Sequence, residues 1–451
     1  MNHFIPKTMS KTENEDVLVK GKEGYKETKL GWIPEDWSLP TIDEVFEFLK
    51  TTSFSRNQLN YDDDNAIYYI HYGDIHSTYK TPILDFEEVQ SVPKLNNDVV
   101  LPSSVQYLKD GDVIIADASE DYEGVGTAIE LQNLDEKKVI SGLHTFALRD
   151  KEDLTAEGFR TYIFKNPIVK KALKTIATGS KVFGISKGNV QKFSIVLPTL
   201  PEQQKIASIL NTWDKAIEAQ EKLIVEKQEL KNGLMQQLLT GKKRFDEFTD
   251  EWEEKSMNDI VKYLGGEAFK STSQVENGVR WLKIANVGIG VIKWGDSTTF
   301  LPTSFIDKNL KYVLKSGDVV MALTRPILND KLKIAVLNKE DGTALLNQRV
   351  AKLISENKND LKFIYYLHQT PYFIYTMNAM MAGTDPPNIS IKDLAKKKVF
   401  VPSYEEQKKI VSVIESFDNE IDSLINKGKH LKKQKQGLMQ QLLTGEKLVK
   451  V

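Results

Sequence analysis

Two stretches of the chain share one pattern of apolar positions, spaced alternately three and four residues apart. In residues 198–241 and 402–445 the pattern comprises Ile206, Leu210, Trp213, Ile217, Ile224, Leu234 and Leu238, and then Ile410, Ile414, Phe417, Ile421, Leu424, Leu431, Leu438 and Leu442. An average spacing of 3.5 residues is typical of a coiled-coil seam. Each stretch is therefore predicted to form one long amphipathic helix.

The two stretches are copies of one another. They align without a gap, and 18 of the 44 positions are identical, including the block Gly-Leu-Met-Gln-Gln-Leu-Leu-Thr-Gly at 233–241 and 437–445. A proline precedes each predicted helix and a glycine follows it, as expected at helix boundaries: Pro201 and Gly241, Pro402 and Gly445. A helix of about 39 residues would be roughly 58 Å long. Such a helix cannot bury a narrow apolar stripe alone, so the other copy is its expected partner.

Polar and glycine residues interrupt the seam. Gln220, Lys227, Lys231 and Lys435 occupy positions where apolar residues are expected. They are interpreted either as solvated gaps or as residues that fix register and orientation. Gly233 and its counterpart Gly437 each cost about 1 kcal/mol relative to alanine within a helix. Their presence in both copies suggests close backbone approach, either between the helices or to another subunit.

The segments before the two helices, 31–200 and 248–401, share an order of predicted elements. Each has a Trp-containing opening (31–37; 248–252), a short helix (42–49; 257–264), a strand (67–70; 281–284), a Gly-Asp turn into an apolar strand (111–116; 317–322), an aromatic helix (159–164; 363–367), a glycine loop (from 179; from 383), an Ile-Ser pair (185–186; 389–390) and a final strand ending at 197–198 or 401–402. Between these landmarks the two segments differ strongly. One architecture is therefore used twice with different surfaces.

The predicted fold class is α/β (α+β), with two mixed domains separated by two long antiparallel coiled-coil helices related by a pseudo-two-fold axis. The expected boundaries are a flexible N-terminal tail at 1–24, a first domain at 25–200, a central helix at 201–241, a second domain at 242–401, a C-terminal helix at 402–445 and a tail at 446–451.

Composition excludes several function classes. The 451-residue chain has no cysteine, so disulfides, thiolate zinc sites and cysteine nucleophiles are all excluded. No apolar run is long enough for a membrane span, and the first 20 residues lack the apolar core of a secretory signal. A cytoplasmic location is expected. The net charge of −2 is unlike that of a stand-alone DNA-binding domain, but it fits a protein whose partners supply much of the contact to phosphates.

Three sequence blocks resemble one known family. They are the opening Tyr-Lys-Glu-Thr-Lys-Leu-Gly-Trp-Ile-Pro-Glu-Asp-Trp at 25–37, the helix entry at 197–206, and the duplicated helix exit at 233–241 and 437–445. From about Gly24 onward the chain resembles the specificity subunits of type I restriction-modification systems. The second helix entry departs slightly, because Tyr404-Glu405-Glu406-Gln407 replaces the prolyl version.

The resemblance implies a non-catalytic DNA-recognition role. Each domain would be a target-recognition domain for one half of a bipartite double-stranded DNA site. The helices would set the spacing and dock two adenine-methyltransferase subunits, to which two motor-endonuclease subunits add. Because the domains differ, the expected target is asymmetric, and lengthening each helix by about a turn is expected to lengthen the gap. No cofactor is expected on this chain; S-adenosylmethionine, ATP and magnesium are expected in the partner subunits.

Polar and basic loop positions are the candidate DNA contacts, because such side chains bind base edges and phosphates. In the first domain they are Thr52, Ser53, Arg56, His71, Tyr72, Ser180 and Lys181, and in the second Lys270, Ser271, Arg280, Asn286, Arg325, Lys331, Lys333, Arg349 and Thr384. For any one of them an ordinary solvated surface role is the favoured interpretation, and about a third of the set is expected to contact DNA. The equivalent loops at 179–181 and 383–385 are interpreted either as phosphate-approaching loops or as structural turns.

No catalytic set is found in the sequence. The chain lacks a phosphate loop of the Gly-x-x-x-x-Gly-Lys-Ser/Thr type, and Asp385-Pro386-Pro387-Asn388 lacks the aromatic residue of a methyltransferase motif. His71 and His76 lie among tyrosines without a ligand set for a metal. Two other classes remain as alternatives: a coiled-coil scaffold whose domains bind proteins rather than DNA, and a fused restriction-methylation enzyme.

Overall fold

The computed structural model describes residues 23–61, 67–79, 81–89, 91–121, 124–179, 182–296, 298–383 and 385–451. The chain divides into two compact units. Unit 1 comprises residues up to 220 together with 427–451, and unit 2 comprises 221–426. Each unit therefore contains one domain, part of the helix that follows it and part of the other long helix.

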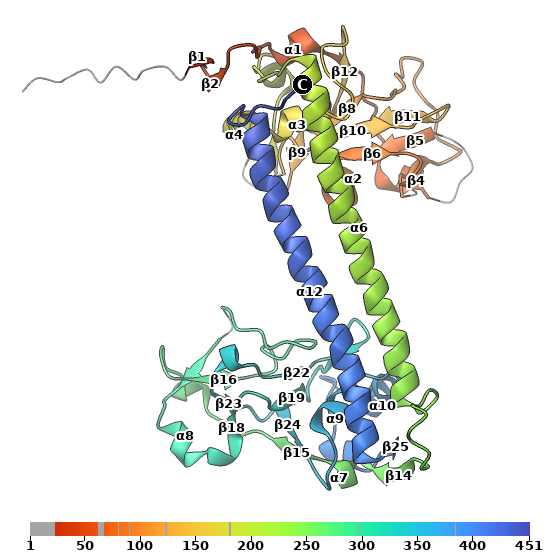
Figure 1. Ribbon diagram of the computed structural model, residues 1–451, viewed down its shortest axis with the longest axis vertical. Helices are drawn as coiled ribbons and strands as arrows, with labels where there is room; N and C mark the ends of the chain where they lie inside the picture. Colours follow the sequence, from red (N-terminus) through yellow and green to blue (C-terminus); the bar gives the residue numbers. More distant parts are fainter. Residues whose placement is uncertain are drawn as a thin grey trace, which may run out of the picture. The chain divides into compact units, whose positions relative to one another are not determined.

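The domain of unit 1 contains two main β-sheets and several short helices (Figure 1). Its elements are β1 (Tyr25–Thr28), β2 (Gly31–Pro34), α1 (Ile42–Val45), β3 (Phe46–Leu49), β4 (Leu59–Asn60), β5 (Ile67–Ile70), α2 (Tyr72–Ser77), β6 (Ile83–Asp85), β7 (Lys94–Leu95), β8 (Val113–Ala116), β9 (Ala118–Ser119), β10 (Ala128–Gln132), β11 (Lys138–Ser141), β12 (Thr145–Asp150), α3 (Arg160–Lys165), α4 (Pro167–Ile176), β13 (Phe183–Gly184) and α5 (Lys187–Gln191). The sheet orders are β3-β12-β8-β10-β6 and β11-β5-β7-β4.

The domain of unit 2 repeats this plan. Its elements are β14 (Glu253–Ser256), α7 (Met257–Ile260), β15 (Val261–Gly265), β16 (Val279–Leu282), β17 (Phe300–Leu301), α8 (Phe305–Lys308), β18 (Val313–Leu314), β19 (Val319–Ala322), β20 (Ile327–Leu328), β21 (Lys331–Leu332), β22 (Ile334–Val336), β23 (Ala344–Leu346), β24 (Val350–Ser355), α9 (Leu361–Leu367), α10 (Pro371–Met381), α11 (Ile391–Ala395) and β25 (Lys398–Val401). The sheet orders are β15-β24-β19-β22 and β17-β16-β23-β18.

The strand order shows that the two domains share one framework. The series β15-β24-β19-β22 matches β3-β12-β8-β10, and the second sheet of each domain contains a parallel pair, β5 with β11 and β16 with β23. The strands predicted after the Gly-Asp turns are confirmed as β8 and β19, and the aromatic helices as α3 and α9.

The short helices predicted at 42–49 and 257–264 are wrong in their second half. Only one helical turn forms in each, and residues 46–49 and 261–265 are strands. Thr41 and Ser256 each form a capping box that starts the turn, and the next residues pair with β12 and β24. The apolar spacing of so short a run suits a helix or a strand, and the sheet partner decides between them.

The two long helices are α6 (Leu200–Leu239) and α12 (Tyr404–Leu443), each of 40 residues. The predicted fold of mixed domains and long helices is thus confirmed. Within unit 1 the domain packs against the first half of α6 and the last part of α12 (Figure 1). Within unit 2 the domain packs on the last half of α6 and the first half of α12. The two helices therefore run antiparallel inside each unit.

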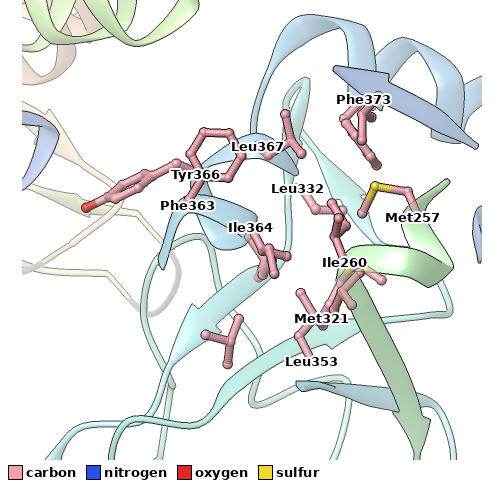
Figure 2. Packing of buried hydrophobic residues seen from close by; sticks show 14 of the residues in the cluster. Met257, Ile260, Met321, Leu332, Leu353, Phe363, Ile364, Tyr366, Leu367 and Phe373 are labelled. Atoms are coloured by element: carbon pink, nitrogen blue, oxygen red, sulfur yellow. The ribbon is translucent and has the colours of Figure 1, made fainter. Parts of the chain in front are cut away.

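The core of unit 2 joins its first sheet to the helices. Figure 2 shows Met321 and Leu353 of the first sheet, Leu332 of β21, and Met257 and Ile260 of α7, in one cluster with residues of α9 and α10. The same cluster contains Leu238, Leu239, Ile410, Val411 and Ile414 from the long helices. In unit 1 the equivalent cluster contains residues of both long helices, namely Ile206, Ala207, Leu210, Leu442 and Leu443. The apolar seam residues at the helix ends thus pack against the domains.

Candidate nucleic-acid interface

The duplicated residues at the helix entries attach each domain to its helix. In unit 1 the Glu202 carboxylate accepts hydrogen bonds from the Trp37 indole (2.9 Å) and the Thr199 hydroxyl (2.7 Å). In unit 2 the Glu406 carboxylate accepts them from the Trp252 indole (3.2 Å) and from Arg244, which binds it through two nitrogens at 2.9 and 2.8 Å. Glu406 is buried and Glu202 is half-buried, and each fixes the tryptophan of its domain opening by this hydrogen bond.

The neighbouring glutamines complete this attachment. Gln203 accepts a hydrogen bond from the Ala156 backbone (2.9 Å) and donates to the Pro198 carbonyl (2.9 Å). Gln407 accepts from the Asp360 backbone (2.8 Å) and donates to the Pro402 carbonyl (3.0 Å). Both side chains are buried, and buried amides must be hydrogen-bonded to be stable.

Each helix exit ends at a glycine with left-handed backbone, against which the domain packs. Gly445 has φ +72°, and an added Cβ would lie 2.4 Å from Pro34. Its carbonyl also accepts a hydrogen bond from the Tyr25 hydroxyl at 2.6 Å. Gly241 has φ +69° and packs against the Trp252 ring. Glycine is the residue that accepts this left-handed backbone without strain.

A second set of repeated contacts links each domain to both helices. In unit 1 the Tyr162 hydroxyl of α3 donates to Asp214 of α6 (2.7 Å), and Lys435 of α12 also pairs with Asp214. In unit 2 the Tyr366 hydroxyl of α9 donates to Asp418 (2.8 Å), and Lys231 pairs with Asp418. We call each of these a Tyr–Asp–Lys clamp.

The clamps decide between the two interpretations of the polar seam positions. Lys231 and Lys435 are ion-paired between the helices, and Lys227 lies 2.7 Å from Glu420. Gln220 is buried. These contacts favour residues that fix the helix register over solvated gaps. Gly233 and Gly437 are exposed, and an added Cβ would meet nothing within 4 Å. Close approach between the helices at these glycines is therefore excluded within each unit.

Three candidates of the first domain form one polar cluster. Arg56 binds the buried Asp74 carboxylate through two nitrogens at 3.1 and 2.7 Å. His71 caps α2 by accepting a hydrogen bond from the Gly73 backbone (3.0 Å), and its ring lies 4.7 Å from the Tyr72 ring. Burial, with Arg56 nearby, lowers the pKa of His71. Most hydrogen-bonding groups of Arg56 and His71 are therefore used within the domain, where they stabilise its structure.

Thr52 and Ser53 line a hollow of about 530 Å³ elsewhere in the first domain. Lys50, Asp117, His144 and Lys187 also line it. His144 lies 3.3 Å from the Asp117 carboxylate and edge-on to Tyr72, with ring centres 5.4 Å apart. Burial raises the pKa of Asp117, against the effect of His144. Ser180 and Lys181 lie outside the described residues.

Some candidates of the second domain have side chains that bind within the domain, and others are exposed. Arg280 donates to the Asp341 carbonyl at 2.5 Å and stacks over Trp294, and Lys333 donates to the Ile284 carbonyl at 2.8 Å. Burial, with Lys293 nearby, lowers the pKa of Lys333. Lys270, Ser271, Lys331, Arg325 and Arg349 are exposed, and Thr384 lies outside the described residues.

The assignment of Asn286 as a DNA contact requires correction. Its side chain is fully buried, accepts a hydrogen bond from the Lys283 backbone (3.0 Å) and donates to the Lys293 carbonyl (3.1 Å). Asparagine is favoured in loops for this local bonding as well as for base contacts. Asn286 therefore shapes its own loop.

Arg349 lines a hollow of about 410 Å³ in the second domain, together with Thr324, Gln348, Pro386 and Asn388. The backbone of Arg325, with φ +48°, bonds to Pro387 beside it. Sequence reasoning missed His144, Asp117, Lys187 and Gln348.

Within the described ranges, no group of three or more His, Asp or Glu side chains could hold a metal ion. In the same part of the chain, no helix is both long and apolar enough to cross a membrane.

Comparison with known proteins identifies the family. The model of the type I restriction modification DNA specificity domain matches residues 34–227 and again 249–433. The MjaVIII specificity subunit of a type I restriction enzyme from Methanocaldococcus jannaschii is 30% identical over 441 residues, which cover 95% of this chain and 97% of that protein. The EcoKI specificity subunit of Escherichia coli is 23% identical, covering 85% and 82%.

Solved structures share the fold. The S subunit of a type I restriction-modification system from M. genitalium superposes with a TM-score of 0.52 at 15% identity, over 92% of this chain and 96% of that chain. A chain from a structure of the type I R-M system concerned with complex assembly and conformational transition gives a TM-score of 0.58 at 17% identity, over 92% and 99%.

The chain belongs to the family of type I restriction-modification DNA-specificity subunits, which recognise DNA and are not themselves catalytic. The resemblance drawn from the sequence is thus confirmed, and the scaffold and enzyme alternatives are not favoured.

Proposed function

We propose that the chain recognises an asymmetric, two-part DNA sequence, each domain binding one half. One observation supports this proposal above all: the two domains are attached to the helices by the same contacts, but the hollows on them are lined by different residues. Both domains are fixed by the same Glu, Gln and Tyr–Asp–Lys contacts, yet one hollow holds Asp117 and His144 and the other Thr324 and Arg349. Equivalent frames that carry different polar groups are suited to different base sequences.

The proposed partners are two adenine-methyltransferase subunits, joined by two motor-endonuclease subunits for restriction. S-adenosylmethionine, ATP and magnesium would be bound by those partners. Support comes from the long helices, whose outer faces are exposed and charged, and from the exposed Gly233 and Gly437 at equivalent positions. Such helical surface is available to a second subunit in both copies.

DNA selection tests the proposal. The chain would be purified with its methyltransferase subunits and used to select duplexes from a random library. We expect one enriched sequence with two specific parts separated by a fixed gap, and affinity that falls steeply with salt, since each neutralised phosphate contributes a slope of about −0.9 in log K against log salt. Recovery of unselected DNA by a well-folded complex would contradict the proposal.

A further inference from the structure

The hollows of the two domains lie at the same place in the framework. The residue after β8, Asp117, donates its backbone N–H to the His144 carbonyl (3.0 Å), and its carbonyl accepts from Ile185 (2.9 Å). The residue after β19, Leu323, donates to the Arg349 carbonyl (2.9 Å) and accepts from Ile389 (2.8 Å). His144 and Arg349 therefore occupy equivalent backbone positions.

The strand register agrees with this equivalence. Thr145, which follows His144, pairs with Ala116 at the end of β8. Val350, which follows Arg349, pairs with Ala322 at the end of β19. Each of the two residues is thus the last one before a central strand, at the rim of its hollow, and its backbone is held by the sheet. A side chain presented from a rigid element is placed more accurately than one on a long loop.

Arg349 differs from the bound arginines of the second domain because its guanidinium group has no partner among the described residues. Arg244 is bound to Glu406, and Arg280 is bound to backbone carbonyls and Trp294. The guanidinium groups of Arg325 and Arg349 have no hydrogen bond or ion pair within the described part of the chain. Arg349 lines the hollow, and Arg325 directly follows Thr324, which also lines it. Of these two unpaired arginines, Arg349 is therefore the one that the hollow presents.

The first domain offers different chemistry. Its arginines, Arg56, Arg149 and Arg160, are bound to Asp74, Asp112 and Thr155 respectively. At the rim position His144 has a half-exposed side chain beside the Asp117 carboxylate. The left-handed backbone of His144, with φ +57°, is one that histidine adopts more readily than most residues. A carboxylate–imidazole pair therefore stands where the second domain has a free guanidinium.

We propose that this rim position determines base specificity in each domain, with Arg349 contacting a guanine in one half of the target and His144 contacting a base in the other half. The guanidinium fork matches the O6 and N7 acceptors of guanine in the major groove. Gln348, beside Arg349 in the same hollow, adds an amide suited to a neighbouring adenine. The assignment rests on the proposed DNA-recognition function and names the residues that carry it.

A phosphate contact is the competing role for Arg349. A lysine can replace an arginine at a phosphate, because a point charge suffices there. At a guanine the bidentate fork is lost, so lysine does not restore the preference. Loss of a phosphate contact weakens binding evenly across sequences, whereas loss of a base contact relaxes one position.

The experiment uses the chain co-expressed with its methyltransferase subunits and maps methylated adenines for the wild type and for Arg349→Ala, Arg349→Lys and His144→Ala. Lys308→Ala, which removes an exposed cation from α8, is the matched control. We expect Arg349→Ala and Arg349→Lys to lose about 10-fold or more of the preference for one guanine, with the other half and the gap unchanged. His144→Ala should relax only the other half.

The outcomes are distinguishable. A wild-type complex that methylates no defined sequence contradicts the proposed function itself. A wild-type motif that persists unchanged in Arg349→Ala, or that is methylated more slowly at every site and restored by Arg349→Lys, overturns the base-contact assignment alone. If Arg349→Ala fails to assemble, Arg349→Lys retains the charge and length of the side chain and decides the question.

Discussion

At the residue scale, the duplicated residues hold the domains on the helices, and the unduplicated ones line the hollows. Asp214 and Asp418 each accept a hydrogen bond from a tyrosine of the domain and form an ion pair with a lysine of the other long helix. The sequence showed which of these residues repeat, but not which partners they meet, because the partners come from distant segments.

Removing the carboxylate of the unit 2 clamp should destabilise that unit. Asp418→Asn leaves the largely buried Lys231 amine without its counter-ion and weakens the bond from Tyr366. We expect a loss of about 1–3 kcal/mol in the free energy of unfolding. Urea unfolding would measure it, with Asp422→Asn on the exposed side of α12 as the control. Equal effects of the two substitutions would show that the clamp contributes nothing specific.

The buried His368 should make unit 2 sensitive to acid. Its Nδ1 donates to the Ile364 carbonyl and its Nε2 is hydrogen-bonded to the Tyr263 hydroxyl, both at 2.7 Å. Burial lowers the pKa of His368 to about 4, from 6.5. The unfolded chain takes up a proton below pH 6.5 and the folded one does not. The stabilisation is therefore present above pH 6.5 and is lost as the pH falls toward 4.

This loss should amount to about 3 kcal/mol, since one pKa unit corresponds to about 1.4 kcal/mol. Unfolding free energies between pH 7 and 4, compared with those of His368→Gln, would isolate the effect. A variant with the same pH dependence as the wild type would contradict it.

The candidate site was predicted only in part at this scale. Residue type and loop position pointed to Arg325 and Arg349, which are both exposed, and Arg349 lines a hollow. The same criteria selected Asn286, which is buried, and passed over His144. Burial and pairing depend on the tertiary neighbours of a loop, and these are not encoded in its local pattern.

At the element scale, periodicity was most informative for the long helices. Their boundaries at Leu200–Leu239 and Tyr404–Leu443 lie within two residues of the predicted ones. Short apolar runs were less informative. Residues 46–49 and 261–265 became strands because β12 and β24 lie beside them. Over 40 residues the apolar spacing distinguishes a helix from a strand, whereas over eight residues it fits either.

Replacing the exposed helical glycines should stabilise the free chain. Gly233→Ala and Gly437→Ala place a Cβ in open space, so each should add about 1 kcal/mol to helix stability. Thermal unfolding would measure the gain, with Gln236→Ala as a control for an exposed helical position. If co-purification with the methyltransferase subunit weakens while stability rises, the glycines are contacts for that partner. A loss of stability would contradict the open surroundings of both positions.

At the scale of the whole molecule, one framework is used twice. The repeat was visible in the sequence because the attachment residues are under the same packing constraints in both copies. The hollows were not visible in the sequence, because the segments that line them in the two domains are not similar to each other. The order of domains and helices could therefore be predicted, while the chemistry of each hollow required the structure.

Helix length should set the gap of the target if the two long helices set the spacing between the half-sites. Inserting seven residues after Gln220 in α6 and after Asn426 in α12 preserves the heptad pattern and lengthens each helix by about 10 Å, or roughly three base pairs. The methylated motif should keep both specific halves and gain about that many unspecified positions. An unchanged gap in a stable, active complex would exclude this role of the helices.

The central claim is that two differing domains on one repeated framework specify one asymmetric, two-part target. Its most direct test is to express the chain with its methyltransferase subunit in a host without DNA methylation and to map modified adenines across the genome. The account predicts one motif with two unlike halves and a fixed gap. A palindromic motif, or an active complex that methylates without sequence preference, would contradict it.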